Sequence, residues 1–230
     1  MASARARRQD AAGTVDDLLA TAERLFAEQG VENVALTAIV AESGQKNRSA
    51  LHYHFGSRAG VLEAVLDRRL APINARRHAL LAAADAEGGV LAIVRADIAA
   101  LGQTVVEEPW GPDYLSILAQ VTFHPQLLGE RQVRGENLSG LRLARARIEA
   151  AAAAGRLPAR LIARRMEWMR DSVVFAMARW VRDTPPAQRT AAGMATLVED
   201  LATYGAAGLL AAPPDQPPVD KKTIGRGPQT

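Results

Sequence analysis

Residues 36–58 read LTAIVAESGQKNRSALHYHFGSR, and the pattern of this stretch decides the fold class. A short helix is expected over about Thr37–Ser43, with Thr37 as its cap. Gly44 then turns the chain into a second short helix, about Asn47–Phe55, which ends at a Gly-Ser pair. Two short helices joined by a tight turn are the arrangement of a helix-turn-helix.

Longer helices are predicted on both sides of this stretch. The preceding helix runs over about Val15–Gln29, capped by Thr14, and Gly30 ends it. Ser57 can cap the following helix, which reaches at least Leu70 before Pro72 ends or kinks it. Three helices within about 45 residues fit a compact DNA-binding unit.

The charge distribution agrees with this function. The formal net charge of the chain is only +3, but the window from Ser43 to Leu62 contains no Asp or Glu. The same window holds Lys46, Arg48 and Arg58, so one surface of the unit is cationic. A phosphate backbone is the partner that such a surface attracts.

The start of the second short helix is expected to enter the major groove, because Asn and Gln can pair with adenine and Arg or Lys with guanine. Hydroxyl groups and backbone N–H groups near helix starts suit phosphate oxygens. The predicted DNA-binding residues are Thr37, Gln45, Lys46, Asn47, Arg48, Ser49, His52, Tyr53, Ser57 and Arg58. Arg5, Arg7 and Arg8 of the basic N-terminus are expected to add contacts.

Several elements at fixed distances make the sequence from Leu18 to Leu66 resemble the DNA-binding domain of TetR-family transcriptional regulators. These elements are Ala22–Phe26, Gln29-Gly30, Leu36–Val40, Ser43-Gly44 and Leu51–Arg58, with Leu62 after them. The turn before Phe55 is one residue longer than the commonest family pattern, and His52 stands where tyrosine is usual. The resemblance implies a palindromic operator, a helical C-terminal domain with an effector pocket, and dimerisation through the last two helices.

The rest of the chain is also predicted to be helical, because alanine is abundant, aromatic residues are 4% and no segment alternates with period two. Further helices are expected at about 73–85, 90–107, 113–122, 133–154, 159–183 and 187–211. The chain is therefore all-α, and we divide it into a disordered basic arm (1–13), the helix-turn-helix domain (14–57), a helical ligand-binding and dimerisation domain (58–211) and a disordered Pro-rich tail (212–230).

The C-terminal half supplies candidates for the two implied sites. Aromatic and methionine side chains suit a mostly apolar pocket between helices, and the candidates are Trp110, Tyr114, Phe123, Met169 and Phe175. An apolar and small-residue stripe on the last helix suits a two-fold interface, and its members are Met194, Leu197, Val198, Leu201, Gly205 and Gly208. The alternative for both sets is that the residues belong to the hydrophobic core of a single subunit.

No catalytic, cofactor or metal site is expected. The chain has no cysteine, no Gly-rich phosphate loop and no nucleophile elbow. His52 and His54 are two residues apart and do not share a helix face, which disfavours a shared metal ion. No apolar run reaches the roughly 18 residues of a membrane span, so a cytoplasmic protein is expected.

The sequence therefore predicts a ligand-responsive, homodimeric repressor of transcription that a mostly apolar small molecule releases from DNA. Two other classes stay open. One is a helical small-molecule-binding or enzymatic protein with an unused helix-turn-helix, which predicts no salt-dependent affinity for DNA. The other is a DNA-coating protein without sequence preference, which the modest net charge disfavours.

Overall fold

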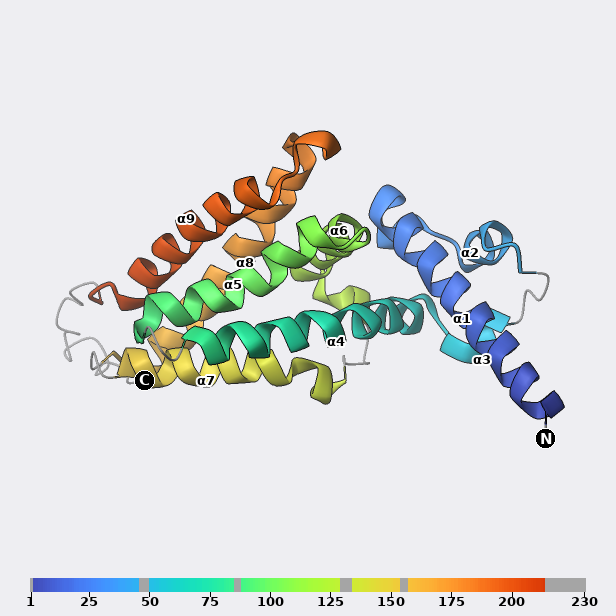
Figure 1. Ribbon diagram of the computed structural model, residues 1–230, viewed down its shortest axis with the longest axis horizontal. Helices are drawn as coiled ribbons and strands as arrows, with labels where there is room; N and C mark the ends of the chain where they lie inside the picture. Colours follow the sequence, from blue (N-terminus) through green and yellow to red (C-terminus); the bar gives the residue numbers. More distant parts are fainter. Residues whose placement is uncertain (1, 46–49, 85–87, 129–133, 154–156, 214–230) are drawn as a thin grey trace, which may run out of the picture.

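The structure, a computed structural model, describes residues 2–45, 50–84, 88–128, 134–153 and 157–213, and these form helices without a strand. The N-terminal helices are α1 (Ala2–Gln29), α2 (Leu36–Glu42) and α3 (Ala50–Phe55). The others are α4 (Arg58–Ala84), α5 (Gly89–Glu107), α6 (Gly111–Phe123), α7 (Ser139–Ala153), α8 (Ala159–Asp183) and α9 (Ala191–Leu210). The molecule is elongated, with α1–α3 at one end and α5–α9 at the other (Figure 1). The all-α prediction is confirmed.

The N-terminal helices bury their apolar faces in the hydrophobic core, which continues into the C-terminal helices. Phe26 of α1, Ile39 of α2, Leu51 of α3 and Leu62 of α4 are all buried and belong to one hydrophobic cluster. Their spacing follows from the sequence, because each helix repeats its apolar residues every three or four positions. Helices α1, α2 and α4 are thereby fixed relative to α3.

Two glycines make the tight connections around α3. Gly44 follows α2 with φ of +71°, and Gly56 follows α3 with φ of +72°. Side chains with a Cβ rarely adopt this left-handed conformation, whereas glycine adopts it without steric cost. The predicted turn positions on either side of α3 are therefore confirmed.

Helix α4 connects the two ends of the molecule without interruption. It continues from Arg58 to Ala84 with Pro72 inside it, so the prediction that Pro72 could end the helix is wrong. Leu70 and Ile73, which flank this proline, are both buried. Packing on both sides of Pro72 offsets the hydrogen bond that the missing N–H removes. One rigid element consequently belongs to both domains.

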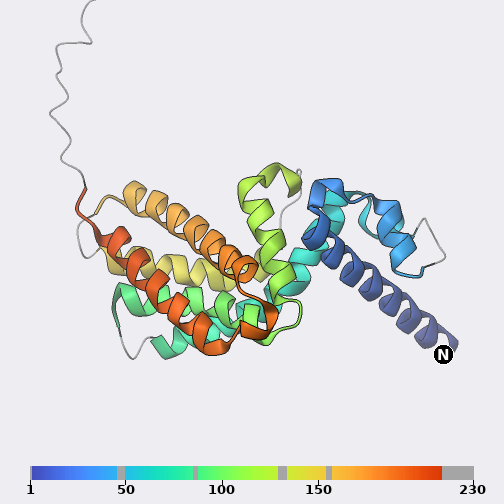
Figure 2. The same ribbon diagram turned by 90° about the horizontal axis from the view of Figure 1, so that it is seen from above.

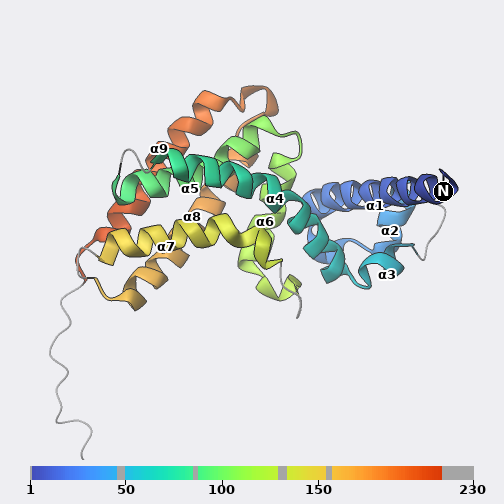
Figure 3. The same ribbon diagram turned by 60° about the horizontal axis from the view of Figure 1, so that its bottom comes forward.

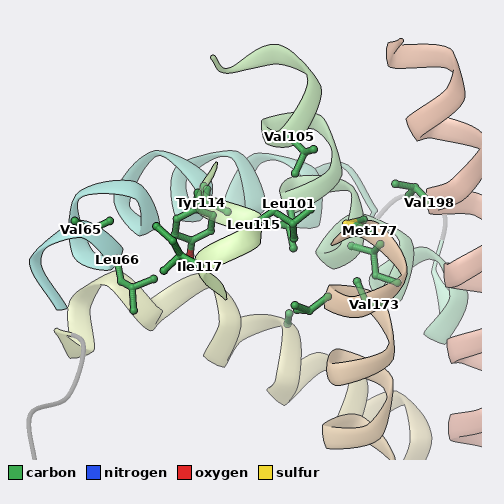
Figure 4. Close-up of a cluster of buried hydrophobic side chains, with 14 of the residues drawn as sticks. Val65, Leu66, Leu101, Val105, Tyr114, Leu115, Ile117, Val173, Met177 and Val198 are labelled. Atoms are coloured by element: carbon green, nitrogen blue, oxygen red, sulfur yellow. The ribbon is translucent and has the colours of Figure 1, made fainter. Parts of the chain in front are cut away.

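The C-terminal domain surrounds α5. This helix packs against α4, α7 and α9, while α6 and α8 close the remaining side (Figures 1 and 3). Figure 4 shows Leu101 and Val105 of α5 meeting Leu115 of α6 and Met177 of α8 in the core. By length and composition α5 could cross a membrane, but 61% of its most apolar window is buried inside the domain. Its apolarity is that of a central core helix.

The structure differs from the sequence prediction at two helix starts. Helix α1 begins at Ala2, so residues predicted as a disordered arm up to position 13 are helical and Thr14 lies inside the helix. Alanine and arginine, which dominate this segment, are strong helix formers. Helix α2 begins at Leu36 after Ala35, and no side chain caps it, so Thr37 is not its cap. The Ser57 cap is confirmed, because Gly60 N donates to Ser57 Oγ at 3.2 Å.

Candidate nucleic-acid interface

Helix α3 has one apolar face and one exposed polar face. Leu51 is buried and Phe55 is half-buried against the domain core. His52 and Tyr53 lie on the other side, where 86% of Tyr53 is exposed. The Tyr53 ring meets the His54 ring edge-on, with 5.3 Å between centroids. An exposed polar helix face at the far end of the molecule can meet DNA without rearrangement of the core.

The other predicted DNA-binding residues are placed as follows. Thr37, Ser57 and Arg58 are exposed, and Gln45 is half-buried at the end of the turn. The residues predicted to read bases, Lys46, Asn47, Arg48 and Ser49, lie outside the described residues. The structure therefore shows the residues on either side of the segment that is predicted to read bases, but not that segment itself.

Two acidic side chains of the N-terminal helices are engaged in ion pairs. Glu23 of α1 pairs with Arg69 of α4 at 2.6 Å, and Glu42 of α2 pairs with Arg24 of α1. Arg58 is exposed and forms no ion pair with any described residue. Glu23 and Glu42 are therefore already paired with arginines of the subunit.

The basic N-terminus lies at the same end of the molecule. Arg5, Arg7 and Arg8 belong to the first turns of α1. Figures 1 and 2 both show α1 projecting beyond α2 and α3, away from the C-terminal domain. The N-terminal part of α1 thus lies at the end of the molecule that holds α2 and α3.

Comparison with known proteins now adds to this geometry. Residues 18–65 match the family of bacterial regulatory proteins described as the tetR family. Residues 18–65 are the DNA-binding domain of a TetR-family regulator. The match includes the C-terminal part of α1, all of α2 and α3, and the first turns of α4. The TetR-family resemblance predicted from the sequence is confirmed.

A solved structure with a similar fold is the fatty acid degradation regulator FadR from Bacillus halodurans. It shares 15% sequence identity with this TetR-family chain, at a TM-score of 0.55. The alignment covers 84% of this chain and 98% of that one, so the likeness of fold extends into the C-terminal domain. A comparison with curated proteins finds no match. The TetR-family domain supports a DNA-binding transcription regulator rather than an enzyme.

The five predicted ligand residues of this TetR-family regulator do not line a single pocket. Phe123 is exposed and packs on Phe175, with 4.0 Å between ring centroids. Trp110 contacts Tyr114 edge-on at 6.0 Å, and Met169 packs where a side chain at Gly205 would have to go. Only Phe175 borders one of the two hollows described next.

Two hollows lie on the C-terminal domain. One, of about 420 Å³, lies on α5 between α4 and α9, and its apolar lining includes Ala96, Ala99 and Val198. The other, of about 730 Å³, lies where α1, α6 and α8 meet, and it includes Phe175 and Asp113. The first hollow had no sequence signal, because its lining residues come from three separate helices and many of them are alanines.

The predicted dimer stripe on α9 divides into two sets. Met194, Val198 and Gly205 are buried inside the subunit, where a Cβ on Gly102 of α5 would meet both Met194 and Val198. The expectation that these three form the dimer interface is therefore wrong, since core side chains cannot reach a partner. The predicted members Leu197 and Leu201 are half-buried, and Gly208 is exposed.

A set of hydrogen bonds connects the two domains, and no pattern in the sequence predicted it. Gln120 of α6 accepts a hydrogen bond from Val31 N at 2.8 Å and donates to the carbonyl of Phe26 at 3.0 Å. It thus satisfies backbone groups where α1 ends. Nearby, burial raises the pKa of Asp113, and the charges of Glu23 and Glu28 add to the rise.

The described residues contain no group of three or more His, Asp or Glu side chains that could hold a metal ion. His52 and His54 are both exposed, and they sit on different faces of the short helix. Their positions suit contacts with solvent or a partner.

Proposed function

We propose that this TetR-family regulator is a dimeric repressor that binds a palindromic operator and is released by a mostly apolar small molecule in the cytoplasm. One observation carries the proposal. The exposed polar face of α3 lies at the far end of the molecule, and the unbroken helix α4 joins its domain to the one with the hollows (Figure 1). A change at the C-terminal end of α4 can therefore alter the position of α3.

In the proposed complex, α3 enters the major groove with Lys46–Ser49 at its leading end. Exposed His52 and Tyr53 and the helix start at Ser57 and Arg58 face phosphates. Replacing Arg48 by alanine should cost about 1–3 kcal/mol of discrimination at the base it reads. The measurement is the affinity for an operator and for its single-base variants. An Arg48→Ala protein that discriminates as the parent does would contradict this placement.

We place the dimer contact on the second face of α9. Leu197, Leu201, Tyr204 and Gly208 recur at spacings of three and four residues, so they share one side of the helix. This side is only partly covered within the subunit, and 67% of Tyr204 is exposed. A dimer is favoured because one helix-turn-helix reads only a few base pairs, whereas a two-fold pair reads two half-sites.

A pair of variants on α9 tests this contact. Tyr204→Glu introduces a charge on the proposed interface, whereas Leu210→Glu introduces the same charge at another exposed apolar residue of the helix. Sedimentation equilibrium should give a dimer for the parent and for Leu210→Glu, and a monomer for Tyr204→Glu. A monomeric parent, or a Tyr204→Glu dimer as tight as the parent, would contradict the proposed interface.

The proposed release acts through the contacts between the two domains. Gln120 fixes α6 to the end of α1, and α4 is shared by both domains. A small molecule that displaces α4 or α6 changes the distance between the two α3 helices of a dimer, which weakens operator binding. Compounds that raise the melting temperature of the protein should therefore lower its operator affinity. Spin labels on the two α3 helices should report a changed separation, and an unchanged separation upon release would refute the mechanism.

A further inference from the structure

The hollow of about 730 Å³ lies where the two domains meet, and we call it the junction hollow. Its walls come from Ala27 and Glu28 of α1, from residues of α6, and from Phe175 and its neighbours on α8. A volume of this size is within the range of sites that bind small organic molecules. A molecule bound in the junction hollow therefore touches α1 and the C-terminal domain at the same time.

Asp113 of α6 borders the junction hollow without a paired cation. The residue is half-buried, and its carboxylate forms no hydrogen bond or ion pair with any described residue. Burial raises the pKa of Asp113, and the negative charges of Glu23 and Glu28 add to the rise. Arg24 and Arg69 oppose the rise, but their guanidinium groups are paired with glutamates. The junction hollow thus contains one carboxylate that lacks a counter-charge.

The other charged side chains around the junction hollow already have partners. Arg179 and Arg182 both donate to Asp183, at 3.3 Å and 2.9 Å, and these two arginine side chains are 77% and 72% exposed to solvent. Arg189 donates to two backbone carbonyls at 2.9 Å, and Glu28 accepts from an arginine of its own helix at 3.0 Å. Solvent screens the exposed charges. A cationic ligand consequently meets an unpaired carboxylate, whereas an anionic ligand would compete with existing contacts.

Much of the remaining lining is apolar, and part of it is aromatic. Leu115 and Ala119 of α6 and Ala178 of α8 border the hollow together with Phe175. The Phe175 ring packs on Phe123, with 4.0 Å between ring centroids. Apolar walls favour an apolar ligand body, and the face of an aromatic ring attracts a cation. The lining therefore suits a molecule with an apolar body and a positively charged head group.

We propose that the junction hollow binds an organic amine, whose ammonium group pairs with Asp113 and whose apolar body contacts Phe175. The inference rests on the proposed ligand-responsive function, and it names the site and the chemical class of the ligand. The ammonium group supplies the counter-charge that Asp113 lacks, and it offsets the repulsion from Glu23 and Glu28. Hydrogen bonds between an ammonium group and a carboxylate are charge-assisted and are among the strong ones.

The same hollow contains hydrogen bonds that connect α6 to α1. Gln120, which borders the hollow, bonds to the backbone of Val31 and Phe26. Ser116 also borders it, and its Oγ donates to the carbonyl of Ala27 at 3.4 Å. A bound amine therefore contacts the end of α1 beside these bonds. Because α1 packs against α2 and α4, the ligand acts on the DNA-binding domain directly.

Two ligand series that differ only in the head group test the role of the charge. Phenylalkylamines with chains of two to six carbons and the corresponding phenylalkanols are titrated into the full-length protein by calorimetry at neutral pH. We expect the best amine to bind at least about tenfold more tightly than its alcohol. Asp113→Asn keeps the shape of the side chain and removes its charge, so this preference should disappear. Asp17→Asn is the matched control, because Asp17 is exposed on α1 and does not border the hollow.

A second pair of variants tests the location of the site. Ala119→Leu fills part of the junction hollow, so it should weaken the binding of amines and alcohols alike. Ala99→Leu fills part of the other hollow, on α5, and should leave both affinities unchanged. Circular dichroism of each variant shows whether it is folded, and Asp113→Asn keeps the test valid if Ala119→Leu is not.

Four results would overturn the proposal. They are equal affinities for amines and alcohols, an amine preference that persists in Asp113→Asn, binding that a folded Ala119→Leu protein retains in full, and no binding in either series. Operator binding by the unliganded parent is measured in parallel. If the operator is bound while no amine is, only the amine site fails; if the operator is not bound, the proposed function fails as well.

Discussion

Replacing Glu23 by glutamine is expected to destabilise the protein by about 3 kcal/mol. The Glu23 side chain is 5% exposed, and it is the sole carboxylate paired with Arg69 among the described residues. Arg69 Nε donates to Oε1 at 2.9 Å and to Oε2 at 3.0 Å, and its Nη2 donates to Oε2 at 2.6 Å. This pair joins α1 of the DNA-binding domain to α4. Glutamine keeps the shape of Glu23 but leaves the guanidinium without a counter-charge.

The magnitude follows from the burial of the pair. Removing one partner of a buried ion pair costs roughly 3–5 kcal/mol, because the remaining charge is desolvated without compensation. We expect the lower end of this range, since 15% of the Arg69 side chain is exposed and its guanidinium lies 4.4 Å from the Trp110 ring centre. In a chain of this size about 1 kcal/mol corresponds to roughly 2–4 °C, so the melting temperature should fall by about 6–12 °C.

Thermal denaturation followed by far-UV circular dichroism measures this effect. The matched control is Glu28→Gln, because Glu28 pairs with Arg24 at 3.0 Å on the exposed surface of the same helix. That exposed pair should contribute only about 0.3–0.5 kcal/mol. If Glu23→Gln lowers the melting temperature no more than Glu28→Gln does, the buried pair does not stabilise the domain as argued.

Three further predictions concern DNA affinity, packing and pH. Arg58→Ala should weaken binding to all duplexes about equally and reduce the slope of log affinity against log salt by about 1, measured by fluorescence anisotropy; a change confined to one sequence would contradict the phosphate role. Gly111→Ala should destabilise by about 3 kcal/mol, because the new Cβ would lie only 2.7 Å from Val105 Cα; an unchanged melting temperature would show that the backbone yields freely. Asp113→Asn should raise the melting temperature at neutral pH, because folding raises the pKa of this carboxyl and thereby disfavours its ionised form. That gain should fade as pH falls through the raised pKa toward the ordinary value of 3.8, and a gain independent of pH would refute the cause.

The N-terminal domain could be predicted because its signals are local. Gly44 and Gly56 mark turns that need a positive φ, and Leu51 and Phe55 show the buried face of α3 within a few residues. The helix from Ala2 and the continuation of α4 through Pro72 were not predicted. Both depend on competition between local preference and the packing or composition of a longer helix, which a short window of sequence does not resolve.

The C-terminal sites could be predicted only in part, because periodicity does not reveal which partner covers an apolar face. The stripe on α9 contains Val198, which faces α5, and Leu197, which lies on the next face of the helix. Arg77 follows Arg76 in a basic segment and looks like a solvated residue, and its partner Asp97 lies on another helix. Such contacts arise from tertiary structure, so no spacing rule in the sequence could identify them.

The central claim is that the chain regulates transcription as a site-specific dimer. Selection of bound fragments from random duplex DNA at near-physiological salt tests this claim most directly. We expect a palindrome whose half-sites lie about one helical turn apart. Fragments held without a common motif would contradict it in favour of a DNA-coating protein, and retention of no DNA would contradict DNA binding itself.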